Sequence, residues 1–265
     1  MKYGMPTLVE CKGIEQCADL AHECGLNFIE INMSFPQYLP SSLDVSRLRE
    51  IMREKNLFYT IHADEQLNPF DFNPKVSSCY FDVMRDTIRF AKALDIPVIN
   101  IHLLKGVYVT LPGQVILLTD VYSDEYMNRV REFIAMCEDE IGESNLKICI
   151  ENVDSNPFTE SQVKALELFM KSDKFALTLD TGHELCLEFK DSFVFEKYPT
   201  KLMHMHLHDA KGKSAHLPLG TADVDVKKKL SVLPTDRTCL IEVKTAVGLR
   251  ESVQKLKEMG LFYND

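Results

Sequence analysis

Two hydrophobic periods alternate along the whole chain. Runs of five to seven residues that are apolar at most positions predict strands whose two faces are both buried. Between them lie longer segments in which apolar residues recur every three or four positions, as on one face of an amphipathic helix. The predicted strands cover residues 27–32, 57–62, 97–102, 147–152, 175–180, 202–208 and 239–243, and a shorter apolar run at 5–9 precedes them.

The predicted helices follow these runs in turn, at residues 14–24, 44–55, 76–94, 124–141, 160–170, 191–198, 224–232 and 247–259. Eight strand-then-helix units, with no low-complexity linker or shift of composition between them, favour a closed parallel barrel over a doubly wound open sheet. We therefore expect an α/β chain that folds as a single (β/α)8 TIM barrel, with residues 1–265 forming one domain.

The composition of the chain indicates which kinds of binding partner are disfavoured. The 40 acidic residues against 30 basic residues give a net charge of −10, which disfavours nucleic acid as a partner. The eight cysteines contain no C-x-x-C pair, and we expect them to be reduced thiols in a cytoplasmic protein. The first residues lack the layout of a secretory signal, and no apolar run approaches the length of a membrane span, so no membrane partner is expected.

Polar side chains at the ends of the predicted strands are the main chemical signal. In barrels of this kind the carboxyl ends of the strands build the active site. Carboxylates and imidazoles gathered there would repel or desolvate one another without a cation, so the set predicts a divalent metal site, although a single strand-end histidine is more often structural. The set comprises His62, His102, Glu151, Asp180, His206, His208 and Glu242.

Residues 201–220 hold four of the eight histidines. Alternation along a strand turns positions 204, 206 and 208 to one face, and the loop that follows returns His216 toward the strand end. His204 lies one layer deeper, which favours a buried structural role. Glu30 points inward by parity, either in a structural pair or in support of the site, and Asn152 and Asp209 are expected to be loop or supporting residues.

Seven short motifs occur in an order that resembles the xylose-isomerase-like TIM-barrel superfamily, which includes sugar phosphate isomerases and epimerases and the endonuclease IV branch. The resemblance spans nearly the whole chain. The motifs are HAD at 62–64, NIH at 100–102, IEN at 150–152, LDTGH at 179–183, MHLHDAKG at 205–212, HLPLG at 216–220 and IEV at 241–243.

The resemblance implies roles for nine of these residues. It implies one divalent ion, with Mn²⁺ or Zn²⁺ favoured over Mg²⁺ or Co²⁺ by mixed imidazole and carboxylate ligation. Glu151 and Glu242 would also be the catalytic acid and base, and a second ion at His62 and His102 is possible. The implied metal ligands are Glu151, Asp180, His206 and Glu242, and the implied substrate-binding residues are His62, His102, His183, His216 and Lys211.

The expected function is a sugar or sugar-phosphate isomerase or epimerase, which moves a proton next to a carbonyl through a metal-stabilised enediolate. The partner would be a small-molecule sugar or sugar phosphate, and a homo-oligomer is possible. One alternative is an abasic-site endonuclease of the endonuclease IV type. Its third zinc site would need a carboxylate where this chain has Ser214, and Lys105 is the only basic residue in the loop 103–123. A second alternative is a non-catalytic sugar-binding barrel, which would not need both glutamates.

Overall fold

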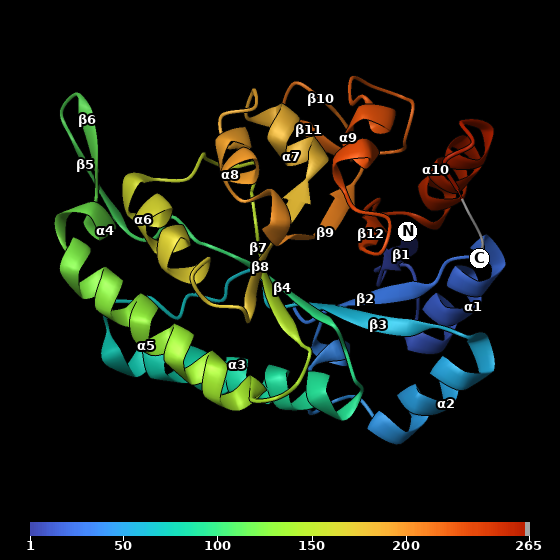
Figure 1. Cartoon of the computed structure of the whole chain (residues 1–265), viewed down its shortest axis with the longest axis horizontal. Helices are drawn as coiled ribbons and strands as arrows, with labels where there is room; N and C mark the ends of the chain where they lie inside the picture. The colour runs from blue at the N-terminus through green and yellow to red at the C-terminus, as the bar shows by residue number, and fades with distance from the viewer. Residues whose placement is uncertain (263–265) are drawn as a thin grey trace.

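Eight parallel strands close into a barrel in the order β1-β12-β9-β8-β7-β4-β3-β2 in the computed structural model, which describes residues 1–262 (Figure 1). Helices surround the barrel, so the predicted TIM-barrel class is confirmed. The barrel strands are β1 (Lys2–Pro6), β2 (Phe28–Asn32), β3 (Phe58–His62), β4 (Val98–His102), β7 (Lys147–Glu151), β8 (Phe175–Asp180), β9 (Leu202–Leu207) and β12 (Thr238–Ile241).

The eight predicted helices are all present, with ends within two residues of the expected ones. Local signals fix these ends: Thr159 and Gln162 form a capping box at the start of α6, and Gly25 ends α1 in the left-handed conformation. None of the helices in residues 1–262 has the length and apolar character needed to cross a membrane. The eight are α1 (Ile14–Cys24), α2 (Val45–Lys55), α3 (Pro74–Ala93), α5 (Ser123–Ile141), α6 (Glu160–Phe169), α8 (Ser192–Lys197), α9 (Val226–Val232) and α10 (Ala246–Glu258).

The first strand lies earlier than the apolar run at 5–9 predicted. β1 pairs through Lys2 with Thr238 of β12 and through Pro6 with Glu30 of β2, so the chain leaves the barrel wall after Pro6. Val9 is 77% exposed in the loop that follows. The hydrophobic pattern did not predict this start because Lys2 and Gly4 are not apolar strand residues. Pairing with the neighbouring strands of the barrel sets the register of β1.

Several short elements stand on the loops beyond the barrel. The loop 103–123 carries the hairpin β5 (Tyr108–Leu111) with β6 (Gln114–Leu117), which projects from the body, and a helical turn α4 (Leu118–Val121) (Figure 1). The carboxyl-end loops carry α7 (Thr181–Cys186) and the hairpin of β10 (Asp209–Lys211) with β11 (Ser214–Leu217). Two turns of 3-10 helix, η1 (Pro36–Tyr38) and η2 (Pro199–Lys201), complete the described elements.

The barrel interior is layered along its axis. Val98, Cys149 and Ala176 form an apolar floor, against which Met203 packs. Buried polar groups from β2, β3 and β9 lie above this floor, and the acidic and imidazole groups at the carboxyl ends lie above those. A polar site is therefore held at one end of a barrel whose other faces are closed by apolar packing.

Gly4 shows how closely the inner strands pack. A Cβ atom at this position would lie 2.4 Å from the ring of Phe28 on the neighbouring strand. We expect Gly4→Ala to lower the free energy of unfolding by about 1–3 kcal/mol through overpacking, as measured by denaturant titration. Gly13→Ala is the matched control because its Cβ would meet nothing closer than 3.6 Å, and an equal loss in both variants would contradict this explanation.

Candidate active site and metal centre

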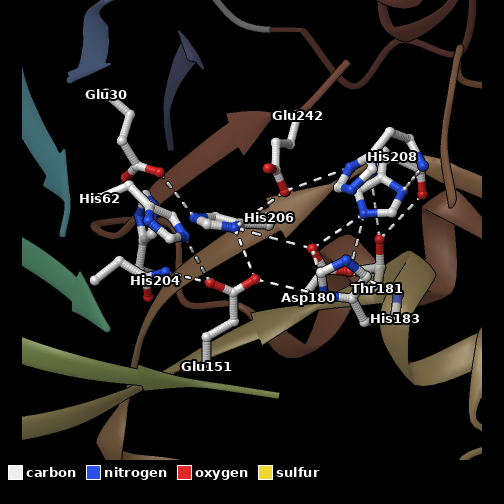
Figure 2. A network of polar contacts seen from close by, with 12 residues as sticks. Glu30, His62, Glu151, Asp180, Thr181, His183, His204, His206, His208 and Glu242 are labelled. Carbon is white, nitrogen blue, oxygen red and sulfur yellow. Dashed lines mark hydrogen bonds and ion pairs between the residues drawn. The ribbon is translucent and has the colours of Figure 1, made fainter. Parts of the chain in front are cut away.

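Four buried side chains converge at the carboxyl end of the barrel (Figure 2). The ligand atoms of Glu151, Asp180, His206 and Glu242 all lie within 4.8 Å of one another. Nδ1 of His206 lies 3.1 Å from Oε1 of Glu151, 3.2 Å from Oε2 of Glu242 and 3.9 Å from Oδ2 of Asp180. The structure thus brings together the four side chains that the sequence predicted as one ligand set.

The electrostatics of this group call for a cation. Burial opposes ionisation of Glu151 and Glu242, yet the adjacent His206 outweighs it and holds the pKa of both carboxyls well below its usual range. Burial likewise opposes a charge on His206, but Glu151, Glu30 and Glu242 raise the pKa of its imidazole well above normal. Three carboxylates around one imidazole nitrogen form a donor set that suits Mn²⁺ or Zn²⁺, so the residues present fit a divalent ion.

Glu242 adds direct support for this fit. Its Oε2 atom is buried and makes no hydrogen bond of good geometry within residues 1–262, although His206 Nδ1 is near. Its other oxygen, Oε1, lies 2.7 Å from Nζ of Lys244. A buried carboxylate oxygen without a donor is costly, and an ion at the centre of the group would satisfy it.

Asp180 is held from two sides. The backbone N–H of His183 donates to Oδ1 of Asp180 at 2.7 Å, which caps the start of α7. Nε2 of His208 lies 3.0 Å from Oδ2 of the same carboxylate. Gly182 leaves the space for this ring, because a Cβ there would lie 2.0 Å from Cε1 of His208.

Glu151 has its own supports. The side-chain amide of Asn100 donates to its Oε2 atom. Nε2 of His102 lies 3.3 Å and Nε2 of His62 3.5 Å from that same oxygen. Nδ1 of His62 is 2.8 Å from the carbonyl of Ala63, which can only accept, so Nδ1 carries a hydrogen and Nε2 is the atom that faces Glu151.

His62, His102 and Glu151 therefore form a second group with ligand geometry. Burial opposes a charge on His62, but Glu151 outweighs it and raises the pKa of the imidazole to about 9. Two electron-rich atoms that face each other need a proton or a metal ion between them. His62 and His102, which the sequence analysis suggested for a second ion, therefore lie where they could bind one together with Glu151.

A third cluster contains His183, His208 and His216. Nδ1 of His208 faces both the backbone N–H of His216 at 2.8 Å and the carbonyl of Asp209 at 3.1 Å, and its Nε2 lies 3.0 Å from Asp180, so both of its nitrogens have partners. Burial lowers the pKa of His216 to about 4, which keeps that ring neutral, and its Nδ1 is buried without a hydrogen-bond partner within residues 1–262. Ser214, at the position of the missing carboxylate, is exposed on β11, so this cluster lacks the acidic ligand of a third zinc site.

Two cavities lie above the four-ligand group. The larger, of about 530 Å³, has walls from the loops after β3, β4 and β7 and includes His102, His183 and Lys105. The smaller, of about 220 Å³, is bounded by the loop after β1 and includes His62, Glu242 and Lys244. Glu65 borders both cavities, and each of them has polar and apolar residues in its walls.

The structure separates the remaining predicted residues. His216 lies near the centre, with Nδ1 3.8 Å from Oε2 of Glu242, whereas Lys211 is exposed on β10 and lines neither cavity. Lys244 is the basic residue that reaches the ligand group, and the sequence analysis missed it. The sequence offered little signal for it, because Lys244 lies beyond the end of β12 and its side chain is half exposed.

Asp209 and Asn152 have structural roles that support the site. The carboxylate of Asp209 accepts four backbone N–H bonds from residues 210, 220, 222 and 224, at 2.8–3.0 Å, and so organises the loop that carries the β10–β11 hairpin. The side chain of Asn152 pairs with the backbone of Asp180 in both directions. Both residues act on the positions of ligand-bearing segments, as a supporting role predicts.

Comparison with known proteins places this geometry in context. A family model described as xylose isomerase-like TIM barrel matches residues 18–259. The curated proteins similar to this chain include two uncharacterised proteins of Methanocaldococcus jannaschii. One, MJ1311, is 24% identical and the alignment covers 97% of this chain and 89% of the relative. The other, MJ1614, is 23% identical over 79% of this chain and 80% of the relative.

Solved structures share the fold over almost the whole chain. A D-tagatose 3-epimerase-like protein has a TM-score of 0.75 at 24% identity, covering 97% of this chain and 96% of its own. D-psicose 3-epimerase from Clostridium cellulolyticum H10, solved with D-tagatose, has a TM-score of 0.74 at 13% identity and full coverage of both chains. An IolI protein with a bound zinc atom has a TM-score of 0.74 at 17% identity, covering 98% and 97%. At these identities the likeness establishes the fold.

The contact between Gly182 and His208 yields a test of how Asp180 is held. We expect Gly182→Ala to displace the His208 ring and to lower the free energy of unfolding by about 1–3 kcal/mol, measured by denaturant titration. Because the cost arises from one contact, it should shrink in a His208→Ala background. An undiminished cost in that background would show that another effect of the new methyl group is responsible.

Proposed function

The chain belongs to the xylose isomerase-like TIM barrel family, and from its site we propose that it is a divalent-metal-dependent isomerase or epimerase of a sugar or sugar phosphate. The observation that carries this proposal is the placement of Glu151 and Glu242 on either side of His206 Nδ1, at 3.1 and 3.2 Å. Two carboxylates that share a metal position are suited to moving a proton next to a carbonyl. The epimerase neighbours in the fold comparison support the same class of reaction.

An ion held by Glu151, Asp180, His206 and Glu242 would polarise the substrate carbonyl and so acidify the neighbouring C–H bond. Oε2 of Glu242 faces the ligand group, while Oε1 faces the smaller cavity and lies beside Lys244. Glu242 can therefore keep one oxygen on the ligand side and present the other to a proton. Glu151 divides its oxygens in the same way between His206 and the pair His62 and His102.

The cavity walls suit a polyhydroxylated substrate. The larger cavity falls in the range of about 300–1,000 Å³ that is common for small-molecule sites. His102 and His183 border it and His62 borders the smaller one, so each can meet a substrate hydroxyl. Lys244 borders the smaller cavity and lies 2.7 Å from Oε1 of Glu242, so it can meet a substrate oxygen there, whereas the resemblance named Lys211 as the substrate-binding lysine.

An abasic-site endonuclease is the second candidate because His62, His102 and Glu151 provide a second group of ligand geometry. Three features weigh against it. The net charge is −10, the third imidazole cluster has Ser214 where a third zinc site would need a carboxylate, and Lys105 is the only basic residue of the loop 103–123. We therefore place the sugar reaction first.

Solvent deuterium incorporation separates the two candidates. The metal-loaded protein should introduce deuterium next to the carbonyl of a ketose or ketose phosphate in D₂O, detected by NMR or mass spectrometry across a panel of sugars. Cleavage of a duplex with one abasic site, without exchange into any sugar, would favour the nuclease instead.

We expect Glu151→Gln and Glu242→Gln each to reduce exchange and turnover by about 10²–10⁴-fold, because each removes a proton-carrying group. The measurement is the exchange rate at saturating metal, with metal content determined for every variant. Glu140→Gln is the control, since Glu140 pairs with Arg89 on the outer surface. Near-normal exchange in either site variant would contradict the acid–base assignment.

Metal loading distinguishes one ion from two. We expect the four-ligand group to bind one equivalent of Mn²⁺ or Zn²⁺, measured by elemental analysis, and chelation to lower the melting temperature, because an ion at about 100 times its Kd stabilises a fold by about 2.7 kcal/mol. If the second group also binds an ion, His102→Ala should lose one equivalent and keep the other. A wild-type protein without bound metal and without a thermal shift would contradict the assigned centre.

A further inference from the structure

Glu30 is a buried carboxylate that the proposed reaction does not use. It lies on β2, on the opposite side of the His206 ring from Asp180, and is 1% exposed (Figure 2). Its Oε1 atom is 3.1 Å from Nε2 of His206, and its Oε2 atom is 3.1 Å from Nε2 of His204. The hydroxyl of Thr60 donates to Oε2 at 2.9 Å. One carboxylate thus touches three polar groups inside the barrel.

This group is not a further ion site. Glu30, His204 and His206 have ligand atoms close together, but each carboxylate–imidazole pair is already at hydrogen-bond distance. All three side chains are buried, and Nδ1 of His204 is taken by the hydroxyl of Thr238 at 2.6 Å. Both ring nitrogens of His204 thus have hydrogen-bond partners, whereas Nε2 of His206 faces Glu30 at ion-pair distance without hydrogen-bond geometry within residues 1–262.

The two ring nitrogens of His206 face different carboxylates. Nδ1 faces Glu151 and Glu242, and Nε2 faces Glu30. An ion in the four-ligand group needs the lone pair of Nδ1, so the hydrogen of the neutral ring then has to be on Nε2. A carboxylate accepts hydrogen bonds, so Glu30 favours that tautomer when the ion is bound.

We propose that Glu30 is a positioning residue of the metal centre, which holds His206 in the Nε2–H tautomer with Nδ1 directed at the ion and makes that nitrogen a stronger ligand. A carboxylate behind a metal-binding imidazole orients the ring and raises its basicity. The inference rests on the proposed function only in that a divalent ion occupies the four-ligand group. His204 and Thr60 orient the Glu30 carboxylate from its other oxygen.

Metal affinity of Glu30→Gln is the direct test. Glutamine keeps the shape of the side chain but removes its charge, so we expect the affinity for Mn²⁺ and Co²⁺ to fall by about 10–100-fold. The measurement is competition with a chromophoric chelator, and the visible absorption of the Co²⁺-loaded protein reports the change in ligand field. Glu140→Gln is the matched control, because it removes the charge of a glutamate that pairs with Arg89 outside the barrel interior. It should leave the affinity and the Co²⁺ spectrum unchanged.

A measurement on the wild-type chain covers the case in which Glu30→Gln does not fold. In protein labelled with ¹⁵N-histidine and loaded with Zn²⁺, long-range ¹H–¹⁵N correlation spectra should show His206 with its hydrogen on Nε2. A hydrogen on Nδ1, or coordination through Nε2, would overturn the proposal.

The outcomes separate this proposal from the proposed function. Weaker metal binding in Glu30→Gln, with no sugar exchange by the wild-type protein, would support the role of Glu30 and contradict the sugar reaction. Unchanged affinity and an unchanged Co²⁺ spectrum, with only a lower melting temperature, would reduce Glu30 to a structural pair and overturn the proposal. A wild-type protein that binds no divalent ion would overturn it as well.

Discussion

The mutual repulsion of three buried carboxylates around one imidazole nitrogen is the constraint on which this structure depends. Glu151, Asp180 and Glu242 each lose hydration at the barrel mouth, and His206 alone cannot repay that loss for all three. Lys244 beside Glu242 and His208 beside Asp180 supply part of the compensation from within the chain. A divalent ion among the four side chains would supply the rest.

The barrel meets this constraint by distributing the ligands over separate strands. Each ligand comes from a different strand end, so parallel pairing sets their spacing, as in the register of His206 beside Asp180 and of Glu151 beside His102. Behind each ligand stands a polar partner that restricts its rotation: Asn100 behind Glu151, His208 behind Asp180, and Lys244 beside Glu242. The positions of the four ligand side chains thus depend both on strand register and on side-chain hydrogen bonds.

Much of this arrangement could be read from the sequence. The eight units and the polar strand ends were predicted from periodicity that is local in the chain. The choice of four ligands around His206, and of Lys211 as a substrate-binding residue, came from the family resemblance. Lys244 was missed because it follows its strand. The β5–β6 hairpin and the helix α7 were also missed, since tertiary contacts rather than pattern define such short elements.

The apolar floor formed by Val98, Cys149 and Ala176 has a consequence for the order of events. The two cavities that border the ligand group both lie on the mouth side, away from this floor. In the proposed enzyme an ion and a sugar would then enter by the same opening, with the ion deeper, so the ion would have to bind first. A bound sugar would slow removal of the ion by chelators.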